Sequence, residues 1–489
     1  MSEGQVLKAA PSILWFRQDL RLSDNPALDA AIKRGGPVIP VFIWAPGEEG
    51  RWPAGAASRW WLHQSLKSLD KSLRDFDSRL IFRKGPSISA LEEIIKETGA
   101  TALFWNRRYE PSIISRDQKI KEGFKSAGIV AESFNGSLLH EPWEVKNKAG
   151  NPFQVFTPFW KHCLNLNDSS SPLPRTKSLA VSEHWPWSFQ LDELQLEPEI
   201  DWAQGMRDAW IPGETGAAAQ VDTFLQKGVM DYSGTRNLPG RPGTSRLSPH
   251  LHFGEISPRQ IWQEAKKFAE RNAIAEKTWQ GWQFLTELGW REFSHHLLYH
   301  FPQMPERPLR PDFERFPWHL DESRLRAWTK GQTGYPLVDA GMRELWAKGW
   351  MHNRVRMVVG SFLVKHLLIS WTEGARWFWD TLVDADLAQN TLGWQWIAGC
   401  GADAAPYFRI FNPVSQGEKF DPQGDYVRCW VPELRGIPDV WIHQPWNAPE
   451  EILEHAGVTF GKNYPKPIVD HAKARAAALS AFAQLKQNI

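Results

Sequence analysis

The chain has 489 residues, 42% of them hydrophobic, so it can form two to four domains whose cores need no crosslinks. Its 57 basic and 56 acidic residues leave a net charge of +1, so a polyanion would have to bind a local basic cluster. The three cysteines, Cys163, Cys400 and Cys429, are widely spaced and argue against a disulfide framework or a structural zinc site, which fits a reducing cytosol.

The N-terminal stretch MSEGQVLKAAPS has no apolar segment of signal-peptide length, and eighteen apolar residues never occur in a row. We therefore expect an unexported protein that does not enter a membrane. The composition is unusual in having 28 Trp against 7 Tyr. Most of these indoles should serve core packing, but the bias also suits a protein that uses indole as a redox group or as a stacking face for bases.

The region from Ser12 to Phe134 alternates short β-branched or aromatic runs with helical patterns. The expected strands are SILWF (12–16), VIPVFIW (38–44), SRLIF (78–82), TALFW (101–105) and IVAESF (129–134), and the expected helices cover 26–33, 58–76, 87–97 and 112–126. This alternation predicts a doubly wound α/β domain with a parallel sheet, to which we assign residues 10–140. Its first turn lacks G-x-G-x-x-G, the usual dinucleotide fingerprint.

The remaining chain divides into a connector and a helical region. Residues 165–202 are rich in Ser, Pro, Trp and Glu without a sustained period, so we assign 141–205 to an interdomain linker. From Met206 onwards apolar residues recur at spacings of three and four and strand patterns vanish. We expect 206–489 to be a nearly all-helical domain.

The stretch from Tyr232 to Gly254 places hydroxyls and glycines before an expected helix start at Ser248-Pro249. Ser and Thr donors beside a helix start can hold a phosphate. A Ser/Thr capping loop would explain the same residues, so the phosphate site stays one of two interpretations.

The segment 284–293 places Glu287, Trp290 and Arg291 at helical spacings of three and four, on one face. An acid beside a flat aromatic ring can hydrogen-bond an imide while the ring stacks on a base. A surface ion pair is the alternative.

The segment 349–357 opens an expected apolar helix that continues through VVGSFLVKHLLISW. Asn353 and Met357 would lie one turn apart, as would Trp350 and Arg354. A polar amide and a thioether on one face suit a pocket for a planar apolar ligand, with helix capping as the competing explanation.

The segment 384–420 begins with two carboxylates, Asp384 and Asp386, and continues with Trp394, Trp396 and several polar or basic residues. Paired aspartates could hold a metal ion. Because no histidine accompanies them at ligand spacing, we predict no metal site.

Taken in this order, these motifs resemble the photolyase and cryptochrome family over essentially the whole chain, from WFRQDLRLSDNPAL onwards. The resemblance is strongest to bacterial cyclobutane pyrimidine dimer photolyases of the class I type, while SRWWLHQSL and SRLSPHLHFGEIS are similar to the class III subgroup. It implies an α/β antenna domain, a long linker and a helical domain that holds FAD in a folded conformation. It also implies a bacterial cytoplasmic protein, which we expect to be monomeric.

The resemblance implies roles for individual residues. At the cofactor site, the phosphates and ribityl chain would lie among Tyr232, Thr244, Ser245, Leu247 and Ser248, with Phe284 nearby. Arg356 would pair with Asp384. Asp386 would lie at the isoalloxazine edge, and Asn390 would face flavin N5. The lesion would contact Glu287, Trp290, Trp396, Asn353 and Met357. The DNA strand would meet Arg236, Arg354, Arg409 and Gln416. Electrons would reach the flavin through Trp318, Trp371 and Trp394, with Trp350 beside Trp346 as a possible second branch.

The implied activity is light-driven repair of cyclobutane pyrimidine dimers in ultraviolet-damaged DNA, by electron transfer from excited, reduced FAD to a flipped-out lesion. We expect Glu287 to donate a hydrogen bond to a pyrimidine carbonyl, which requires a raised pKa in an apolar site. The alternative is a blue-light-sensing cryptochrome. Asn390, which is Asp in most plant cryptochromes, the complete lesion motifs and the absence of a long extension after Gln487 favour repair.

Two further function classes fit less well. A flavin oxidoreductase would need a nicotinamide site, and a pure DNA-binding module leaves the polar segment 384–390 unexplained. For the antenna chromophore we expect methenyltetrahydrofolate rather than a deazaflavin. Asn106 and Glu110 are candidate folate contacts, although both also suit ordinary strand-end positions.

Overall fold

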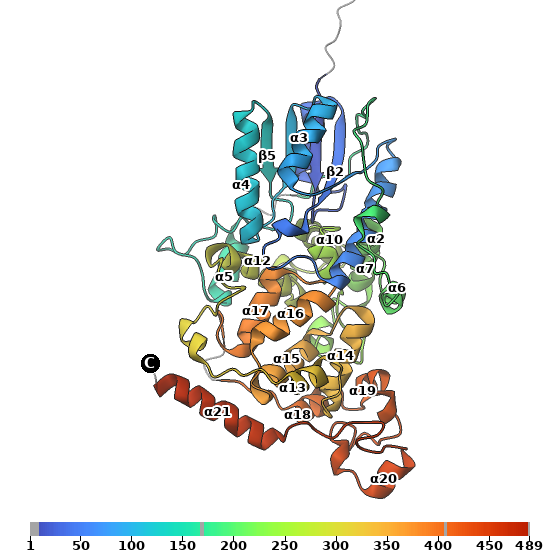
Figure 1. Cartoon of the computed structure of the whole chain (residues 1–489), viewed down its shortest axis with the longest axis vertical. Helices are drawn as coiled ribbons and strands as arrows, with labels where there is room; N and C mark the ends of the chain where they lie inside the picture. The colour runs from blue at the N-terminus through green and yellow to red at the C-terminus, as the bar shows by residue number, and fades with distance from the viewer. Residues whose placement is uncertain (1–8, 167–170, 405–407, 488–489) are drawn as a thin grey trace, which may run out of the picture.

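The computed structural model describes residues 9–166, 171–404 and 408–487. Figure 1 shows an α/β unit at one end of the molecule and a larger helical body beneath it, with the C-terminal helix α21 at the far end from the sheet. This architecture confirms the predicted fold class. The first eight residues, including most of the N-terminal stretch examined for a signal peptide, lie outside the described part.

The sheet has five parallel strands in the order β3-β2-β1-β4-β5. They are β1 (Ser12–Phe16), β2 (Val38–Trp44), β3 (Ile81–Lys84), β4 (Ala102–Asn106) and β5 (Val130–Phe134). Strand β3 begins three residues later than expected. The preceding residues form a turn in which Asp77 has φ +56° and the N–H of Ser78 donates to the carbonyl of Leu73.

Four helices accompany the sheet: α1 (Pro26–Arg34), α2 (Ala56–Arg74), α3 (Ser87–Thr98) and α4 (Pro111–Ser126). Each lies close to its expected range. The core around α2 continues into the helical body, because Trp60 and Trp61 are buried together with Phe253, Trp350 and Val383. This shared core joins the two halves of the molecule.

The close approach of the two halves depends on a glycine in the HFGE segment. Gly254 has φ +65°, and a Cβ atom there would lie 2.2 Å from the carbonyl oxygen of Gln18. The backbone N–H of Leu20 donates to the carbonyl of Phe253 (3.1 Å), and the indole of Trp61 donates to Glu255 (2.9 Å). Only glycine fits this contact without a shift of the backbone.

The connector is less uniform than its composition indicates. Helix α5 (Phe156–Asn165) packs against α12 of the helical body, while among the described residues from 171 to 203 only the short 3-10 turn η2 (Asp192–Leu194) is helical. The N–H of Phe189 donates to the carbonyl of Phe82 (3.1 Å), so the connector runs along the β3 edge of the sheet. We retain the proposed division at 140 and 205, with α5 as a part of the linker that is anchored on the helical domain.

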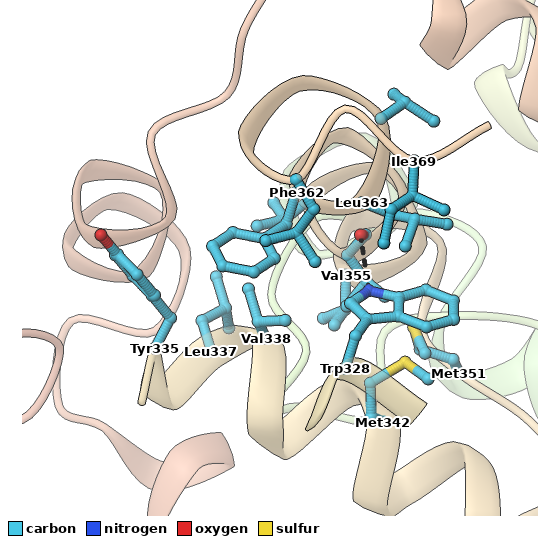
Figure 2. Close-up of a cluster of buried hydrophobic side chains, with 14 of the residues drawn as sticks. Trp328, Tyr335, Leu337, Val338, Met342, Met351, Val355, Phe362, Leu363 and Ile369 are labelled. Atoms are coloured by element: carbon cyan, nitrogen blue, oxygen red, sulfur yellow. Dashed lines mark hydrogen bonds between the residues drawn. The ribbon is translucent and has the colours of Figure 1, made fainter. Parts of the chain in front are cut away.

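The helical body is built from α6 (Gln204–Ala209) onwards. Its α-helices are α7 (Glu214–Lys227), α8 (Tyr232–Thr235), α9 (Ser248–His252), α10 (Pro258–Arg271), α11 (Glu276–Gln280), α12 (Gln283–His300), α13 (Glu322–Thr329), α14 (Pro336–Lys348), α15 (Asn353–Ser361), α16 (Trp371–Thr381), α17 (Leu387–Ala398), α18 (Pro413–Phe420), α19 (Asp425–Trp430), α20 (Glu450–His455) and α21 (His471–Gln487). Figure 2 shows its largest core, where Trp328 lies near Met342 and Met351 and donates its indole N–H to the carbonyl of Val359 (3.1 Å).

The prediction of one long apolar helix from residue 349 to 371 is wrong. His352 caps α15, so Trp350 precedes the helix and does not share a helical face with Arg354. The helix continues only as a π-helical turn (Phe362–His366), Leu368 adopts φ +53°, and Ser370 caps the separate helix α16. Hydrophobicity continues across this break because both helices enter the same core. Among the described residues, every helix is too short or too polar to cross a lipid bilayer.

Candidate active site

The loop between α8 and α9 presents free hydroxyl groups. Thr244, Ser245 and Ser248 are half-buried, and their hydroxyls make no hydrogen bond to another described residue. The loop itself is fixed, because Gln220 donates to the carbonyl of Ser245 (2.9 Å) and Leu247 is buried. A rigid loop with unused hydroxyl donors suits an anionic ligand better than it suits a cap.

Two aromatic side chains lie near this loop. Phe284 is buried and its ring centroid lies 6.0 Å from that of Tyr232. Burial and the nearby charge of Glu287 raise the pKa of Tyr232, so its hydroxyl stays protonated and can donate a hydrogen bond.

Arg356 and Asp384 form the ion pair that the motif comparison implied. The guanidinium donates to both carboxylate oxygens (2.9 and 3.1 Å) and also to the carbonyl of Met351 (2.8 Å). Asp384 is buried and Arg356 half-buried. This bidentate contact connects α15 to the start of α17.

Asp386 is the N-cap of α17, and its side chain accepts the N–H of Gln389 (2.9 Å). Its second carboxylate oxygen lies 3.4 Å from His295 and 3.9 Å from His252. Burial raises the pKa of Asp386, but the charge of His295 and the contacts of both His252 and His295 outweigh burial and hold this pKa well below its usual value. The carboxylate is therefore ionised although it is buried.

Asn390 lies one turn further along α17 and is half-buried. Its amide nitrogen donates to the carbonyl of Ala375 on α16 (3.0 Å). This bond fixes the orientation of the amide and directs its oxygen away from Ala375, where it can meet a ligand.

Glu287 lies in an ion pair in place of the apolar surroundings that we expected. Arg236 approaches it to 2.6 Å, and Gln283 donates to the same carboxylate (2.9 Å). Arg291 does not share this face: it is buried and donates to the carbonyl of Ser137 (2.6 Å). The charged partner of Glu287 therefore comes from the residue that directly follows α8, 51 positions earlier.

Trp290 stacks on Phe156 of the connector helix α5, with ring centroids 3.9 Å apart and planes at 8°. Trp396 and Met357 are half-buried, and Asn353 is exposed at the start of α15. None of these three has a ring contact or side-chain hydrogen bond to another described residue. Their side chains therefore remain available to a ligand.

Four side chains expected to meet a DNA strand lie near this surface. Arg354 is held by Asn237 (2.9 Å), and burial together with the charges of Arg236 and Arg409 lowers its pKa. Arg409 is exposed, and the side-chain oxygen of Gln416 is buried without a partner among the described residues. The three guanidiniums are close enough to repel one another, which leaves this surface positively charged.

The three tryptophans of the expected relay share one core. Trp394 and Trp371 are buried, and Trp318 is partly buried against the same cluster. Gly374 lies one turn beyond Trp371 on α16, and a Cβ atom there would lie 2.1 Å from the ring of Trp394. The backbone N–H of His319 donates to the carbonyl of Leu368, which places the Trp318 segment beside the residues that precede Trp371.

A small pocket lies between the α/β unit and the helical body. Its polar lining includes Arg17, Gln18, Glu49, Arg108 and His252, and its aromatic lining includes Trp15, Trp44 and Trp379. The described residues contain no group of three or more His, Cys, Asp or Glu side chains that could hold a metal ion.

The two candidate antenna contacts differ in availability. Asn106 donates to Asp19 (2.6 Å) and Asn25 (2.7 Å) and accepts the N–H of Ala27 (3.2 Å), so its side chain is fully used. The strand-end interpretation fits Asn106. Glu110 is paired with Arg108, which lines the pocket.

Comparison with known proteins decides the family. Residues 12–177 match the model described as "DNA photolyase" and residues 284–484 the model described as "FAD binding domain of DNA photolyase". The deoxyribodipyrimidine photo-lyase of Agrobacterium fabrum is 49% identical over 98% of this chain and 99% of its own length. The chain belongs to the photolyase and cryptochrome family.

Two other relatives show the breadth of this similarity. Cryptochrome-1 of Arabidopsis thaliana is 45% identical over 97% of this chain and 71% of its own length. A crystal structure of a bacterial class III photolyase from Agrobacterium tumefaciens, 49% identical, superposes with a TM-score of 0.95 over 100% of both chains.

The helical body is the FAD-binding domain of this family, and its residues fit the cofactor. The free hydroxyls of Thr244, Ser245 and Ser248 are suitable donors for phosphates. The guanidinium of Arg246, beside the same loop, has a buried Nε without a partner among the described residues. At the N-terminus of α17, Asp386 is an ionised acceptor that suits an N–H donor of the cofactor.

Two histidines of the site escaped sequence reasoning. His252 and His295 flank Asp386, although no histidine lies near it in the sequence. Their only sequence signal is the repeated histidine in PHLHFGE and FSHHLLYH, which identifies no partner. Phe156, the stacking partner of Trp290, lay in a segment that we assigned to the linker.

Proposed function

We propose that this protein is a deoxyribodipyrimidine photo-lyase that repairs cyclobutane pyrimidine dimers in ultraviolet-damaged DNA with light. The observation that carries the proposal is the 49% identity to a deoxyribodipyrimidine photo-lyase over nearly the full length of both chains. The contacts of the side chains around Asp384 to Asn390 and around Glu287 support the proposal. The similarity to the class III photolyase structure favours the class III subgroup.

DNA binding would depend on the cationic surface formed by Arg236, Arg354 and Arg409. Phosphate contacts of this kind carry binding to undamaged DNA and make it sensitive to salt. A lesion flipped out of the duplex would then enter between Trp290 and Trp396, with Asn353 and Met357 beside them. Stacking on the indoles would separate damaged from undamaged DNA.

The flavin site would be held by side chains that are already ordered. Thr244, Ser245 and Ser248 would bind the phosphates, with Tyr232, Leu247 and Phe284 around them. When bound, reduced FAD supplies a photoexcitable one-electron donor. Arg356 keeps Asp384 paired, while Asp386 would accept a hydrogen bond from the ring and the amide oxygen of Asn390 would be free to meet it.

Glu287 would hydrogen-bond a pyrimidine carbonyl of the lesion. Whether it can do so depends on its contact with Arg236. An ionised carboxylate only accepts hydrogen bonds, so it cannot donate to a carbonyl. In the free protein Arg236 compensates this charge at 2.6 Å. We propose that a DNA phosphate draws Arg236 away, which frees the Glu287 carboxyl group to meet the lesion.

Two cofactor-related proposals accompany this function. Trp318, Trp371 and Trp394 would carry electrons from the surface to the flavin, with Trp350 and Trp346 as a second branch. Methenyltetrahydrofolate would occupy the pocket between the two halves, where Trp15, Arg17 and Arg108 offer stacking and charge. We propose Glu110 as an indirect contact through Arg108 and withdraw Asn106.

We also propose that the protein acts as a monomer in the bacterial cytoplasm. Size-exclusion chromatography with light scattering tests the monomer, which should elute near the chain mass of 56.0 kDa. A cryptochrome-type signalling role remains the alternative, since Cryptochrome-1 of Arabidopsis thaliana is 45% identical.

The deciding experiment is to purify the protein, record its absorption spectrum and measure dimers in ultraviolet-treated DNA after blue illumination. Repair predicts a flavin spectrum and a light-dependent loss of dimers. A flavin spectrum with unchanged dimer content would favour signalling.

A further inference from the structure

The flavin-edge cluster consists of His252, His295 and Asp386, which come from α9, α12 and the N-cap of α17. All three side chains are buried, with exposed fractions of 7%, 8% and 7%. One carboxylate oxygen of Asp386 lies 3.4 Å from Nε2 of His295 and 3.9 Å from Nδ1 of His252. The fold thus places two imidazoles beside a carboxylate for which the sequence resemblance implied only a flavin contact.

The contacts of His295 determine its charge. Its Nδ1 lies 3.0 Å from the carbonyl oxygen of Arg291, and a carbonyl only accepts, so Nδ1 carries a proton. Its Nε2 faces the Asp386 carboxylate, which also only accepts. An acceptor beside each ring nitrogen favours the imidazolium form of His295.

The electrostatics agree with this geometry. Burial lowers the pKa of His295, but the charge and hydrogen bond of Asp386 outweigh burial and raise it above its usual value. The opposite shift at Asp386 has the same origin. Imidazolium and carboxylate together are neutral, which is how a buried charge is tolerated.

His252 is held in a different state. Its Nε2 lies 3.3 Å from the amide nitrogen of Gln18, which donates, so the proton of His252 sits on Nδ1. That Nδ1 is buried without a hydrogen-bond partner among the described residues and faces Asp386. His252 therefore directs an N–H towards Asp386 from 3.9 Å, further away than His295.

Neighbouring charged groups make the ionisation of Asp386 depend more strongly on His295. Glu110 lies close enough to Asp386 for their negative charges to interact, although Arg108 is paired with it. On α12, Arg291 opposes the charging of His295, while Glu292 is also close enough to interact with it. Tyr109 contacts the ring of His295 edge-on at 6.2 Å and directs its hydroxyl to Glu141. Of these groups, His295 is the cation in contact with Asp386.

We propose that His295 is a positioning residue of the flavin site, which as an imidazolium keeps Asp386 in its charged, hydrogen-bond-accepting form. This inference rests on the proposed function, because it takes the flavin ring edge as the donor to Asp386. Without His295, the buried carboxylate would take up a proton and could no longer serve as a fixed acceptor for the ring N–H.

The test compares oxidised holoprotein of the wild type, His295→Gln and His295→Arg. The wild-type flavin absorption should be constant between pH 5.5 and 8.5. His295→Gln should show a new pH-dependent transition in that range and roughly tenfold faster loss of FAD, because a charge-assisted hydrogen bond is lost. His295→Arg, which restores the charge, should recover the flat profile.

The matched control is His300→Gln on the same helix, where the ring contacts the carbonyl of Pro142 (3.0 Å) and the rings of His296 and Tyr299, and it should behave as the wild type. A flat profile with normal FAD retention in His295→Gln would overturn the proposal. If that variant does not fold, nitrogen-15 NMR of histidine-labelled wild-type protein decides, since a neutral His295 ring at pH 7 would equally overturn it. A parallel repair assay separates the two claims: a wild type with the expected flavin profile but no dimer repair contradicts only the proposed function.

Discussion

The flavin side and the proposed DNA-facing side of the helical body place their charged groups in opposite ways. On the flavin side Asp384 and Asp386 are buried and each has a cation in contact. On the DNA-facing side three guanidiniums lie close together, and Glu287 is the acid that pairs with Arg236. A permanent cofactor favours charges that are already balanced, whereas a transient polyanion favours a surface whose charge it neutralises on arrival.

The largest effect should follow from breaking the balance on the flavin side. Arg356→Leu leaves Asp384 as an uncompensated buried charge, which should cost about 3 kcal/mol of stability and most of the bound FAD. Thermal unfolding and the ratio of FAD to protein measure both effects. Arg376→Leu removes an exposed guanidinium paired with Glu373 and should change neither quantity. Equal behaviour of the two variants would contradict the idea of a balanced flavin side.

The proposed stacking role of Trp396 tests the DNA-facing side, because among the described residues this indole has no ring partner in the free protein. Trp396→Ala should weaken binding to dimer-containing DNA about tenfold, since a lost base–indole stack costs about 1 to 3 kcal/mol. Binding to undamaged DNA should not change. Fluorescence anisotropy with both DNAs measures the difference, and Trp187→Ala, in the exposed connector, is the control. Equal losses on both DNAs would contradict the stacking assignment.

How far these regions could be predicted from the sequence depends on how local their contacts are. The five strands and four helices of the α/β unit follow from hydrophobic periodicity, and the Arg356–Asp384 pair follows from family motifs. The flavin-edge cluster does not, because its members are separated by 43 and 91 positions and only the packing of three elements brings them together. The partner of Glu287 was missed for the same reason, since helical spacing pointed to Arg291 and the fold supplied Arg236.

The helix break after Ser361 illustrates a second limit. Continuous hydrophobicity predicted one helix, whereas the chain forms a π-helical turn and begins again at Trp371. Periodicity reports which residues are buried, and it does not report where the hydrogen-bond register changes. This break lies next to the core that contains Trp371 and Trp394. Of these two relay residues, Trp371 was predicted at the end of one long helix, whereas it begins α16.

A further prediction concerns the acid stability of the protein and a buried histidine, His366, that belongs neither to the flavin side nor to the DNA-facing side. Burial and the neighbouring His471 lower the pKa of His366 to about 3, below its ordinary value of 6.5. The unfolded chain therefore binds a proton that the native ring does not, and stability is lost as the pH falls from 6.5 towards 3, by at most about 1.4 kcal/mol per pH unit. His366→Phe should reduce this loss between pH 6.5 and 4.5, as measured by urea unfolding. The exposed His455→Gln should retain it, and an unchanged acid sensitivity in His366→Phe would contradict the assignment.

The smallest effect should come from a single cation on the DNA-facing side. Arg354→Gln removes one phosphate contact, so the slope of log binding constant against log salt for undamaged DNA should fall by about one. Binding titrations at four salt concentrations measure the slope, with Arg376→Gln as the control. An unchanged slope would show that Arg354 does not meet the DNA strand.

The most direct test of the account uses an oligonucleotide with one thymine dimer and the purified protein carrying reduced FAD. After blue illumination, chromatography should show conversion of the dimer to two intact thymines, while a dark control and illumination without protein should show none. If the flavin is bound and reduced, and the illuminated dimer nevertheless stays intact, the proposed repair activity is wrong.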